Sequence, residues 1–369
     1  DYLEKRGINQ NSIENFKLGF VPNTSSFSLP RLVKKFPELD ANEIKECLVE
    51  IGLVKAGRGE EVFDVMRGRV IFPIRRNDGK VVAFGGRILD KSQSAAKYLN
   101  TKESQFYHKR KTLYGLYETV KSKVNLQSLT LVEGYLDVIA LHQEGIVNAV
   151  ATCGTAVTRE HGETVSRFVS SATLLFDGDS AGKKAVNKSA ESFQNLPIDI
   201  SVSFLPEGSD PDSLIRSEGK VAIEKVLADA KPLLEVYVKN TYEQHTEKSE
   251  TPVNKGLAAK SINAYIEKII NPVEKESAYK FAAKLLEISS DTLVGMDQKS
   301  KPHSAVTEDW ENDLASSFVE LDEEEPSLPK LSFEFVPPKG QGYSEKNPQL
   351  LAVDRSLRLL SLAIFVDTS

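Results

Sequence analysis

The chain has 369 residues, of which 40% are hydrophobic and 27% charged, and its formal net charge is −6. This length predicts two or three domains, and the composition excludes a fibrous or wholly disordered protein. No apolar run approaches the roughly 20 residues of a membrane helix and no signal peptide is visible, so a soluble protein without a membrane partner is expected. The two cysteines, Cys47 and Cys153, are too few for a four-ligand zinc site and favour reduced thiols in the cytoplasm. Because the chain begins at Asp1 and not at Met, we expect a fragment of a longer protein.

The net charge hides two blocks of opposite sign. Residues 65–123 contain 14 Lys and Arg against 4 Asp and Glu, whereas residues 124–369 carry a net charge of −14. A basic block beside an acidic block suits a protein that handles a polyanion and binds a cation. The alternative is that solvated faces differ in charge by chance.

The first 123 residues predict a basic α+β subdomain. Helical spacing of apolar residues predicts short helices through residues 1–64, for example over 13–20 and 41–54. Two β-rich runs, 69–76 and 80–89, are joined by Asn-Asp-Gly, which predicts a β-hairpin. Residues 92–123 are polar, basic and rich in turn residues.

From residue 128 the pattern alternates between strands and helices. Strands are predicted over 128–134, 147–152, 173–178 and 199–205, and helices over 135–145, 158–169 and 180–193. This alternation predicts a parallel sheet that is covered on both faces. Residues 211–296 are helical throughout, 297–348 have the composition of a linker, and the apolar stretch 350–366 either opens a further domain or is foreign sequence.

Acidic residues follow three of the predicted strands. They are Glu133 and Asp137 in VEGYLD, Asp177 and Asp179 in DGD, and Asp210 and Asp212 in SDPDSL. In an open parallel sheet the ligand site lies at the carboxyl ends of the strands, so these carboxylates converge if the strands are neighbours. Carboxylate oxygens suit one or two Mg²⁺ ions, which also share substrate phosphates. Each cluster alone has an ordinary explanation as a helix cap or a turn.

The motifs together resemble a known family. LVEGYLDVIAL followed by DGDSAGKKA resembles the Toprim domain of primases, topoisomerases and some nucleases. YLEKRGI, MRGRVIFPIR, FGGRIL, KYLNTKES and FYHKRKTLYGL, in this order, resemble the amino-terminal half of the bacterial DnaG-type DNA primase catalytic core. The resemblance covers roughly residues 1–290. It implies a mixed α/β fold in which a Toprim sheet lies between a basic α+β subdomain and a helical subdomain.

The resemblance also implies an activity and its partners. The family makes short RNA primers on single-stranded DNA from NTPs, with Mg²⁺ (or Mn²⁺ as a substitute), at the bacterial replication fork. In the family, the replicative helicase binds a carboxy-terminal domain, which this chain is expected to lack or to retain only as its tail. The family's amino-terminal zinc-binding domain is expected to be absent as well. Nucleotide alarmones such as (p)ppGpp compete for the nucleotide pocket in the family.

Site residues are implied by position. Glu133, Asp177 and Asp179 are the expected catalytic metal ligands, and Asp137, Asp210 and Asp212 complete the acidic cluster. The expected nucleotide-binding residues are Arg67, Arg87, Lys97, Tyr98, Asn100 and Lys109. The expected nucleic-acid-binding residues are Arg6, Arg69, Arg87, Lys97 and Lys109. Gly85 and Gly86 are expected to let the backbone approach the nucleic acid. Tyr98, Phe106 and Tyr107 are candidates for stacking on bases; the alternative for all three is ordinary core packing, which is favoured for Phe106.

Four subdivisions of the chain follow: a basic subdomain over 1–124, the Toprim part over 125–210, a helical subdomain over 211–296, and a linker or tail over 297–369.

The alternative functions within the same fold are a Toprim nuclease and a topoisomerase, although no tyrosine has an obvious nucleophile motif. The alternatives of another class are a haloacid-dehalogenase-type phosphatase with Asp177 as nucleophile, and a non-catalytic nucleic-acid-binding module.

Overall fold

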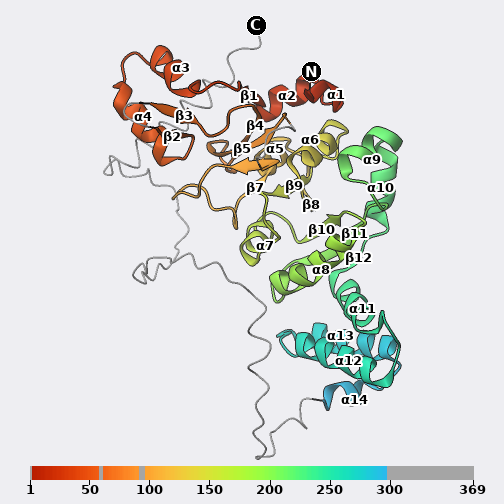
Figure 1. Ribbon diagram of the computed structural model, residues 1–369. Coiled ribbons are helices and arrows are strands. Elements are labelled where there is room, and N and C mark those ends of the chain that lie inside the picture. The colour runs from red at the N-terminus through yellow and green to blue at the C-terminus, as the bar shows by residue number, and fades with distance from the viewer. Residues whose placement is uncertain (1, 58–60, 91–95, 297–369) are drawn as a thin grey trace, which may run out of the picture.

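The computed structural model describes residues 2–57, 61–90 and 96–296. The predicted linker and the apolar stretch 350–366 lie outside these residues. Three parts follow one another in chain order, from the N-terminal part at the top of Figure 1, through a central sheet, to a helical part at the bottom.

An antiparallel four-stranded sheet organises the N-terminal part, in the order β1-β4-β5-β6. These strands are β1 (Gly19–Val21), β4 (Arg69–Arg75), β5 (Val81–Ile88) and β6 (Tyr98–Asn100). Beside it lie α1 (Tyr2–Lys5), α2 (Gln10–Phe16), α3 (Ser28–Lys35), α4 (Ala41–Glu50) and a small sheet of β2 (Val54–Ala56) and β3 (Val62–Asp64). The predicted hairpin is confirmed as β4–β5, with a left-handed Gly79 in its turn.

The expectation of helices throughout residues 1–64 was wrong in part, because β1, β2 and β3 also lie there. The helix predicted over 13–20 ends at Phe16, where Lys17 takes a left-handed conformation, and the chain then pairs with β4. Three-residue strands carry too few residues for their alternation to be recognised, so pairing with β4 outweighs the local helical spacing.

The central sheet has six strands, in the order β12-β11-β10-β8-β9-β7. They are β7 (Leu113–Tyr114), β8 (Ser128–Val132), β9 (Ala149–Thr152), β10 (Ser171–Phe176), β11 (Asp199–Phe204) and β12 (Lys231–Pro232). The four inner strands are parallel, as predicted, whereas the two-residue edge strands β7 and β12 are antiparallel and were not predicted. The helices that connect these strands include α5 (Leu116–Lys121), α6 (Tyr135–Gln143), α7 (Arg159–Val165) and α8 (Ser180–Phe193).

Helices dominate the rest of the described chain. They are α9 (Pro211–Glu218), α10 (Lys220–Ala228), α11 (Leu233–Thr246), α12 (Pro252–Ile266), α13 (Pro272–Leu286) and α14 (Ser290–Val294). Because α9 packs on α6 and β12 pairs with β11, the central sheet and its helices continue past residue 210.

Two shared cores join the three parts. Phe72 of β4 and Tyr135 of α6 lie 5.5 Å apart between ring centroids, and Tyr114 lies 4.6 Å from Tyr135. Between the central and helical parts, Phe193 of α8 and Ile262 of α12 belong to the same buried cluster. The central sheet is therefore packed against both neighbours through apolar side chains.

Candidate functional site

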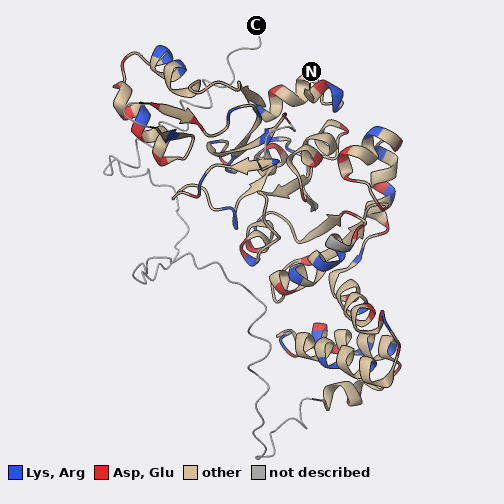
Figure 2. Cartoon of the chain, in the orientation of Figure 1, with Lys and Arg blue, Asp and Glu red and all other residues tan. Residues whose placement is uncertain are grey.

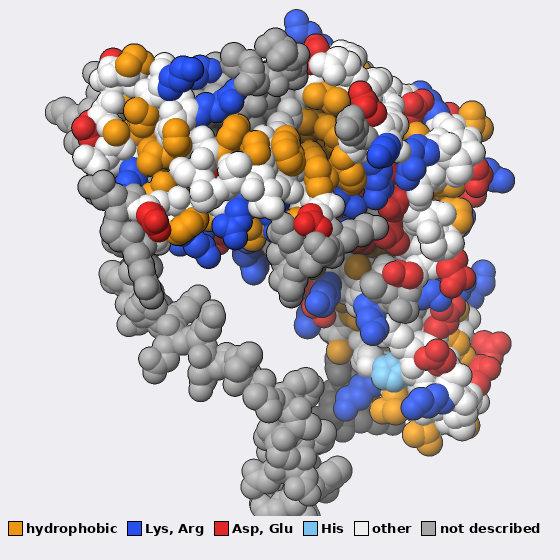
Figure 3. Space-filling view, turned by 45° about the horizontal axis from the view of Figure 1, so that its top comes forward, with side chains coloured by type: hydrophobic (Ala, Val, Ile, Leu, Met, Phe, Trp, Pro, Cys, Tyr) orange, Lys and Arg blue, Asp and Glu red, His pale blue; other side chains and the backbone are white. Residues whose placement is uncertain are grey.

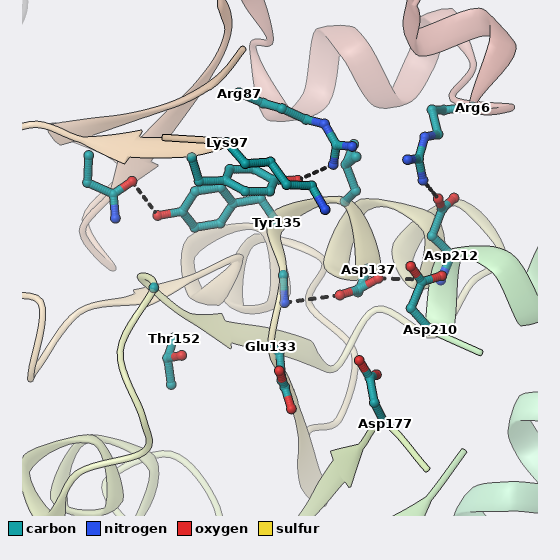
Figure 4. A pocket seen from close by; sticks show the side chains of 15 residues that line it. Arg6, Arg87, Lys97, Glu133, Tyr135, Asp137, Thr152, Asp177, Asp210 and Asp212 are labelled. Atoms are coloured by element: carbon teal, nitrogen blue, oxygen red, sulfur yellow. Dashed lines mark hydrogen bonds and ion pairs between the residues drawn. The ribbon is translucent and has the colours of Figure 1, made fainter. Parts of the chain in front are cut away.

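The acidic side chains follow strands that lie next to each other. Glu133 comes directly after β8 and Asp177 directly after β10, and these two strands pair in parallel. The strand order reverses between them, because β9 lies on one side of β8 while β10 and β11 lie on the other. Ligands of open α/β sheets bind at such a switch point, and Figure 4 shows both carboxylates there.

The turn after β10 requires glycine. A Cβ on Gly178 would lie 2.2 Å from the carbonyl oxygen of Leu205, and one on Gly182 would lie 2.3 Å from the carbonyl oxygen of Asp177. The intervening Asp179 caps α8, since its Oδ1 accepts from the backbone N–H of Gly182 at 2.8 Å. Close packing of the turn thus fixes the direction in which Asp177 leaves the sheet.

A pocket of 280 Å³ brings acidic and basic side chains together. Ten of the predicted site residues line it: Arg6, Arg87, Lys97, Tyr98, Asn100, Glu133, Asp137, Asp177, Asp210 and Asp212. Lys and Arg as well as Asp and Glu occur in each of the three described parts (Figure 2), but in Figure 3 basic side chains lie directly beside acidic ones on one face.

Among the residues that the structure describes, no cation compensates Glu133 or Asp177. Burial raises the pKa of Glu133, and the charges of Asp177 and Asp179 raise it further. Burial and the charges of Asp210 and Asp179 likewise raise the pKa of Asp177. Such mutual repulsion fits a bound cation with oxygen ligands. Within the described residues no three Asp, Glu, His or Cys side chains are grouped to hold one ion, but Mg²⁺ usually takes only one or two carboxylates.

Two of the remaining carboxylates, Asp137 and Asp212, are already engaged. Asp137 accepts from the backbone N–H groups of Gly134 at 3.0 Å and Asp212 at 3.4 Å, and burial, together with the charge of Asp210, raises its pKa to about 8. Asp212 is 1% exposed and accepts from Arg6 at 2.6 Å and from Arg216. These contacts make Asp137 and Asp212 supports of the pocket wall, unlike Glu133 and Asp177.

Asp210 has a different environment from Asp177. Burial would raise its pKa, but hydrogen bonds from Ser213 and the charges of Arg6 and Arg216 lower it below its usual value. Its Oδ1 accepts from the backbone N–H of Ser213 at 2.7 Å, which caps α9. Asp210 therefore stays ionised more easily than Glu133, Asp137 or Asp177.

The basic wall centres on Arg87. Its guanidinium lies 5.4 Å from the ring centroid of Tyr2 and 5.2 Å from that of Tyr98, and donates to the Tyr98 hydroxyl at 2.6 Å. Lys97 is exposed beside it and lines the same pocket. Tyr2 was not predicted, and the only sequence signal for it is its place in YLEKRGI.

Asn100 links the two walls. Its Nδ2 donates to the carbonyl oxygen of Cys153 at 2.7 Å, and its Oδ1 accepts from the Tyr135 hydroxyl at 2.9 Å. Tyr135, Thr152 and Gly154 also line the pocket and were not predicted as site residues. Their sequence signal is their position at the strand ends, next to Glu133 and within ATCGTA.

Four predicted site residues do not line the acidic pocket: Asp179, Arg67, Arg69 and Lys109. Asp179 nevertheless lies close enough for its charge to raise the pKa of Glu133 and Asp177. Arg69 is buried and donates to the carbonyl oxygens of Gly86 at 3.0 Å and Ala96 at 2.9 Å. Arg67 lines a separate groove with Lys55. The backbone N–H of Lys109 donates to Glu103 at 2.7 Å. In the described chain none of these four side chains lines the acidic pocket.

The structure gives a different reason for glycine at Gly85 and Gly86, and the expected approach of nucleic acid to this backbone stays a prediction. A Cβ on Gly85 would lie 2.4 Å from the Tyr135 ring, and one on Gly86 would lie 2.7 Å from the sulfur of Met66. Both glycines are needed because protein side chains pack on them. Tyr107, a candidate for base stacking, is fully buried.

Family models match the two parts of the chain that form the pocket. Residues 1–120 match the N-terminal domain of the DNA primase catalytic core, and residues 130–215 match the Toprim-like family. Among the described helices, none is both long and apolar enough to cross a membrane.

Curated proteins and solved structures that are similar to this chain are also DNA primases. The chain is 35% identical to a DNA primase of Legionella pneumophila over 308 residues, which are 82% of this chain and 51% of that protein, so it spans about half the length of this curated relative. A DNA primase domain from Pseudomonas aeruginosa is similar in structure, with a TM-score of 0.69, 35% identity and coverage of 79% of this chain and 89% of that one. A DnaG primase catalytic domain bound to ssDNA has a TM-score of 0.65 at 32% identity, over 77% and 89% of the two chains.

Proposed function

The chain belongs to the DNA primase family as a DnaG-type catalytic core, and from this premise we propose that it synthesises short RNA primers on a single-stranded DNA template. The observation that carries the proposal is the pair of uncompensated carboxylates, Glu133 and Asp177, opposite the cationic wall of Arg87 and Lys97. Nucleotidyl transfer needs a site of this kind, because a polyanionic triphosphate must be held while charge develops on its α-phosphate.

Each wall has a distinct role in this proposal. Glu133 and Asp177 would hold Mg²⁺, with Asp179 and Asp210 close by, and Mn²⁺ would substitute. Bound there, the metal would neutralise phosphate oxygens and align the attacking and leaving groups. Arg87 would bind a phosphate with its planar fork, and Lys97 would act as a point charge. Asn100 and Tyr135 would hold the two walls at a fixed separation.

Primer synthesis by matched variants tests this function. Extension of a short RNA on single-stranded DNA with labelled NTPs and Mg²⁺ is measured for the parent chain, Asp177→Asn, Glu133→Gln and Asp199→Asn. The first two keep the shape of the side chain but remove its charge, so each should lose at least about 100-fold in rate. Asp199 is exposed on β11 outside the pocket and serves as the control.

Other products would redirect the assignment. Cleavage of DNA without RNA synthesis, dependent on Glu133 and Asp177, would replace the proposal by a Toprim nuclease. RNA synthesis that survives both substitutions would overturn the proposed roles of the two carboxylates.

The wider role is proposed from the family. The template would be single-stranded DNA, as in the ssDNA-bound relative, the substrates NTPs, and the product an RNA primer. We place the activity in the bacterial cytoplasm at the replication fork, with the replicative helicase as partner of the whole protein and (p)ppGpp as a competitor in the nucleotide pocket. The proposed functional parts remain 1–124 for template and NTP binding, 125–210 for metal binding, 211–296 as the helical subdomain and 297–369 as the tail.

A further inference from the structure

A second cavity lies at the opposite end of β5 from the acidic pocket. Val82 lines this cavity, whereas Arg87 lines the acidic pocket. Five residues of strand at about 3.3 Å each place the two regions about 17 Å apart. The cavity measures 410 Å³, which lies within the range of small-molecule sites.

One side of this cavity is apolar and aromatic. Phe106 and Phe168, both half-buried, line it together with Leu113 and Leu116. Phe168 follows α7 of the central part, while Phe106 belongs to the segment after β6. Flat apolar surfaces of this kind bind an aromatic ring through burial and stacking.

The other side is cationic. Lys111 and His108 are exposed and line the cavity, as do Arg75, Arg76 and Arg167. Among its described lining residues there is no Asp or Glu. The acidic partners of the hairpin arginines, Glu118 and Asp78, are not among them. This distribution favours a ligand that carries negative charge.

Arg75 supplies a second, independent indication of a ligand. Its side chain is 5% exposed, pairs with Glu118 and lies over the Tyr117 ring at 4.6 Å. Its Nε is buried and has no hydrogen-bond partner among the described atoms. A buried N–H group without an acceptor is unfavourable, so an oxygen atom of a ligand in the cavity would satisfy the Arg75 Nε once the side chain turns toward it.

We propose that this cavity is a second nucleotide site, which binds the base of a nucleoside phosphate against Phe106 and Phe168 and its phosphate at Lys111 and Arg75. A bare anion would leave the aromatic side unused, and an apolar ligand would leave the cationic side unused. The site is separate from the acidic pocket and does not depend on primer synthesis. A free nucleotide and the terminal nucleotide of a strand present the same chemistry to it.

Photolabelling of the full chain with 8-azido-AMP in EDTA tests the site, since EDTA removes the metal that supports binding at the acidic pocket. Saturable labelling is expected within residues 106–113 or 164–168. Lys111→Glu should weaken it about tenfold through charge reversal, and Phe168→Leu should weaken it through loss of the ring face. Lys121→Glu, exposed on α5 and outside the cavity, and Arg87→Gln should leave it unchanged.

Competition distinguishes the source of the ligand. Displacement by AMP alone would identify a free nucleotide, and stronger displacement by a short oligonucleotide would identify a strand end. The proposal is overturned if labelling does not saturate, if Lys111→Glu behaves like Lys121→Glu, or if inorganic phosphate competes as well as AMP does.

Discussion

The two walls of the acidic pocket are held in place by different kinds of interaction. On the acidic wall, short turns and helix caps direct the carboxylates, as at Gly178 and Asp179. On the basic wall, aromatic rings hold the guanidinium of Arg87, and these rings come from β6 and from the distant helix α1. Each carboxylate of the acidic wall is thus directed by the turn or helix cap at its own strand end, whereas Arg87 of the basic wall is held by rings from two segments far apart in the chain.

This difference predicts that the walls fail differently. A local turn tolerates little change because backbone atoms surround it on all sides. The Arg87 side chain can lose one of its two ring contacts and keep the other, so substitutions around it should reduce activity in steps and not abolish it. Substitutions in the acidic wall should therefore abolish activity, and those in the basic wall should mainly raise the KM for NTPs.

Gly178→Ala should have the largest effect. The added methyl group would lie 2.2 Å from the carbonyl oxygen of Leu205, so the turn must open and move Asp177. We expect primer synthesis to fall at least about 100-fold, since small displacements of a catalytic group have effects of this size. Gly256→Ala in α12 is the control, because nothing lies within 4 Å of the new Cβ and alanine favours a helix. Full activity of Gly178→Ala would contradict a rigid acidic wall.

Acid should weaken the junction between the N-terminal and central parts at His142. Burial lowers its pKa to about 4, although its Nε2 contacts the carbonyl oxygen of Ala149 at 2.8 Å, and its ring meets Phe16 of the N-terminal part. Below about pH 6.5 the unfolded chain binds a proton that the folded chain does not bind until about pH 4, so stability is full above pH 6.5 and falls between these values. The contribution of His142 to the free energy of unfolding should drop by up to about 3 kcal/mol over this range, and the difference between the parent chain and His142→Gln isolates it from carboxyl groups such as Asp137, whose raised pKa acts in the opposite direction.

Chemical denaturation between pH 4 and pH 8 measures this slope. His142→Gln should flatten it, whereas His108→Gln, at an exposed position, should not. Equal slopes for the parent chain and His142→Gln would exclude this histidine as the source.

Substitutions of two arginines in the basic subdomain should have different effects, one on NTP binding and the other on the stability of the fold. Arg87→Lys loses the planar group between Tyr2 and Tyr98, so the KM for NTPs should rise about tenfold while the melting temperature stays the same. Arg69→Lys leaves the carbonyl oxygens of Gly86 or Ala96 without a donor, so stability should fall by about 1–3 kcal/mol. Steady-state kinetics and thermal denaturation of both variants check the contrast. A specific rise in KM for Arg69→Lys would return this residue to the binding surface.

The sequence was most informative for residues whose place in the site depends only on where a strand ends. Glu133 and Asp177 could be placed because parallel strands end at one edge of the sheet, and their neighbours β8 and β10 pair as the argument required. Arg69 and Arg87 could not be separated, because both lie in β-rich basic runs and only the tertiary packing buries one of them. The short strands β1 and β12 were missed because pairing, not local pattern, creates them.

Tyr2 should give the smallest and most specific effect. Its ring contacts Arg87, while its hydroxyl is buried without a partner among the described atoms, so the ring alone should matter. Tyr2→Phe keeps the ring and should leave kinetics unchanged. Tyr2→Leu removes a cation–π contact worth about 0.5–1 kcal/mol, so the KM for NTPs should rise about two- to fivefold at unchanged kcat. A merely structural role of Tyr2 would lower kcat and the melting temperature together and leave the KM for NTPs unchanged. That result for Tyr2→Leu would show that Tyr2 supports the fold and does not position Arg87.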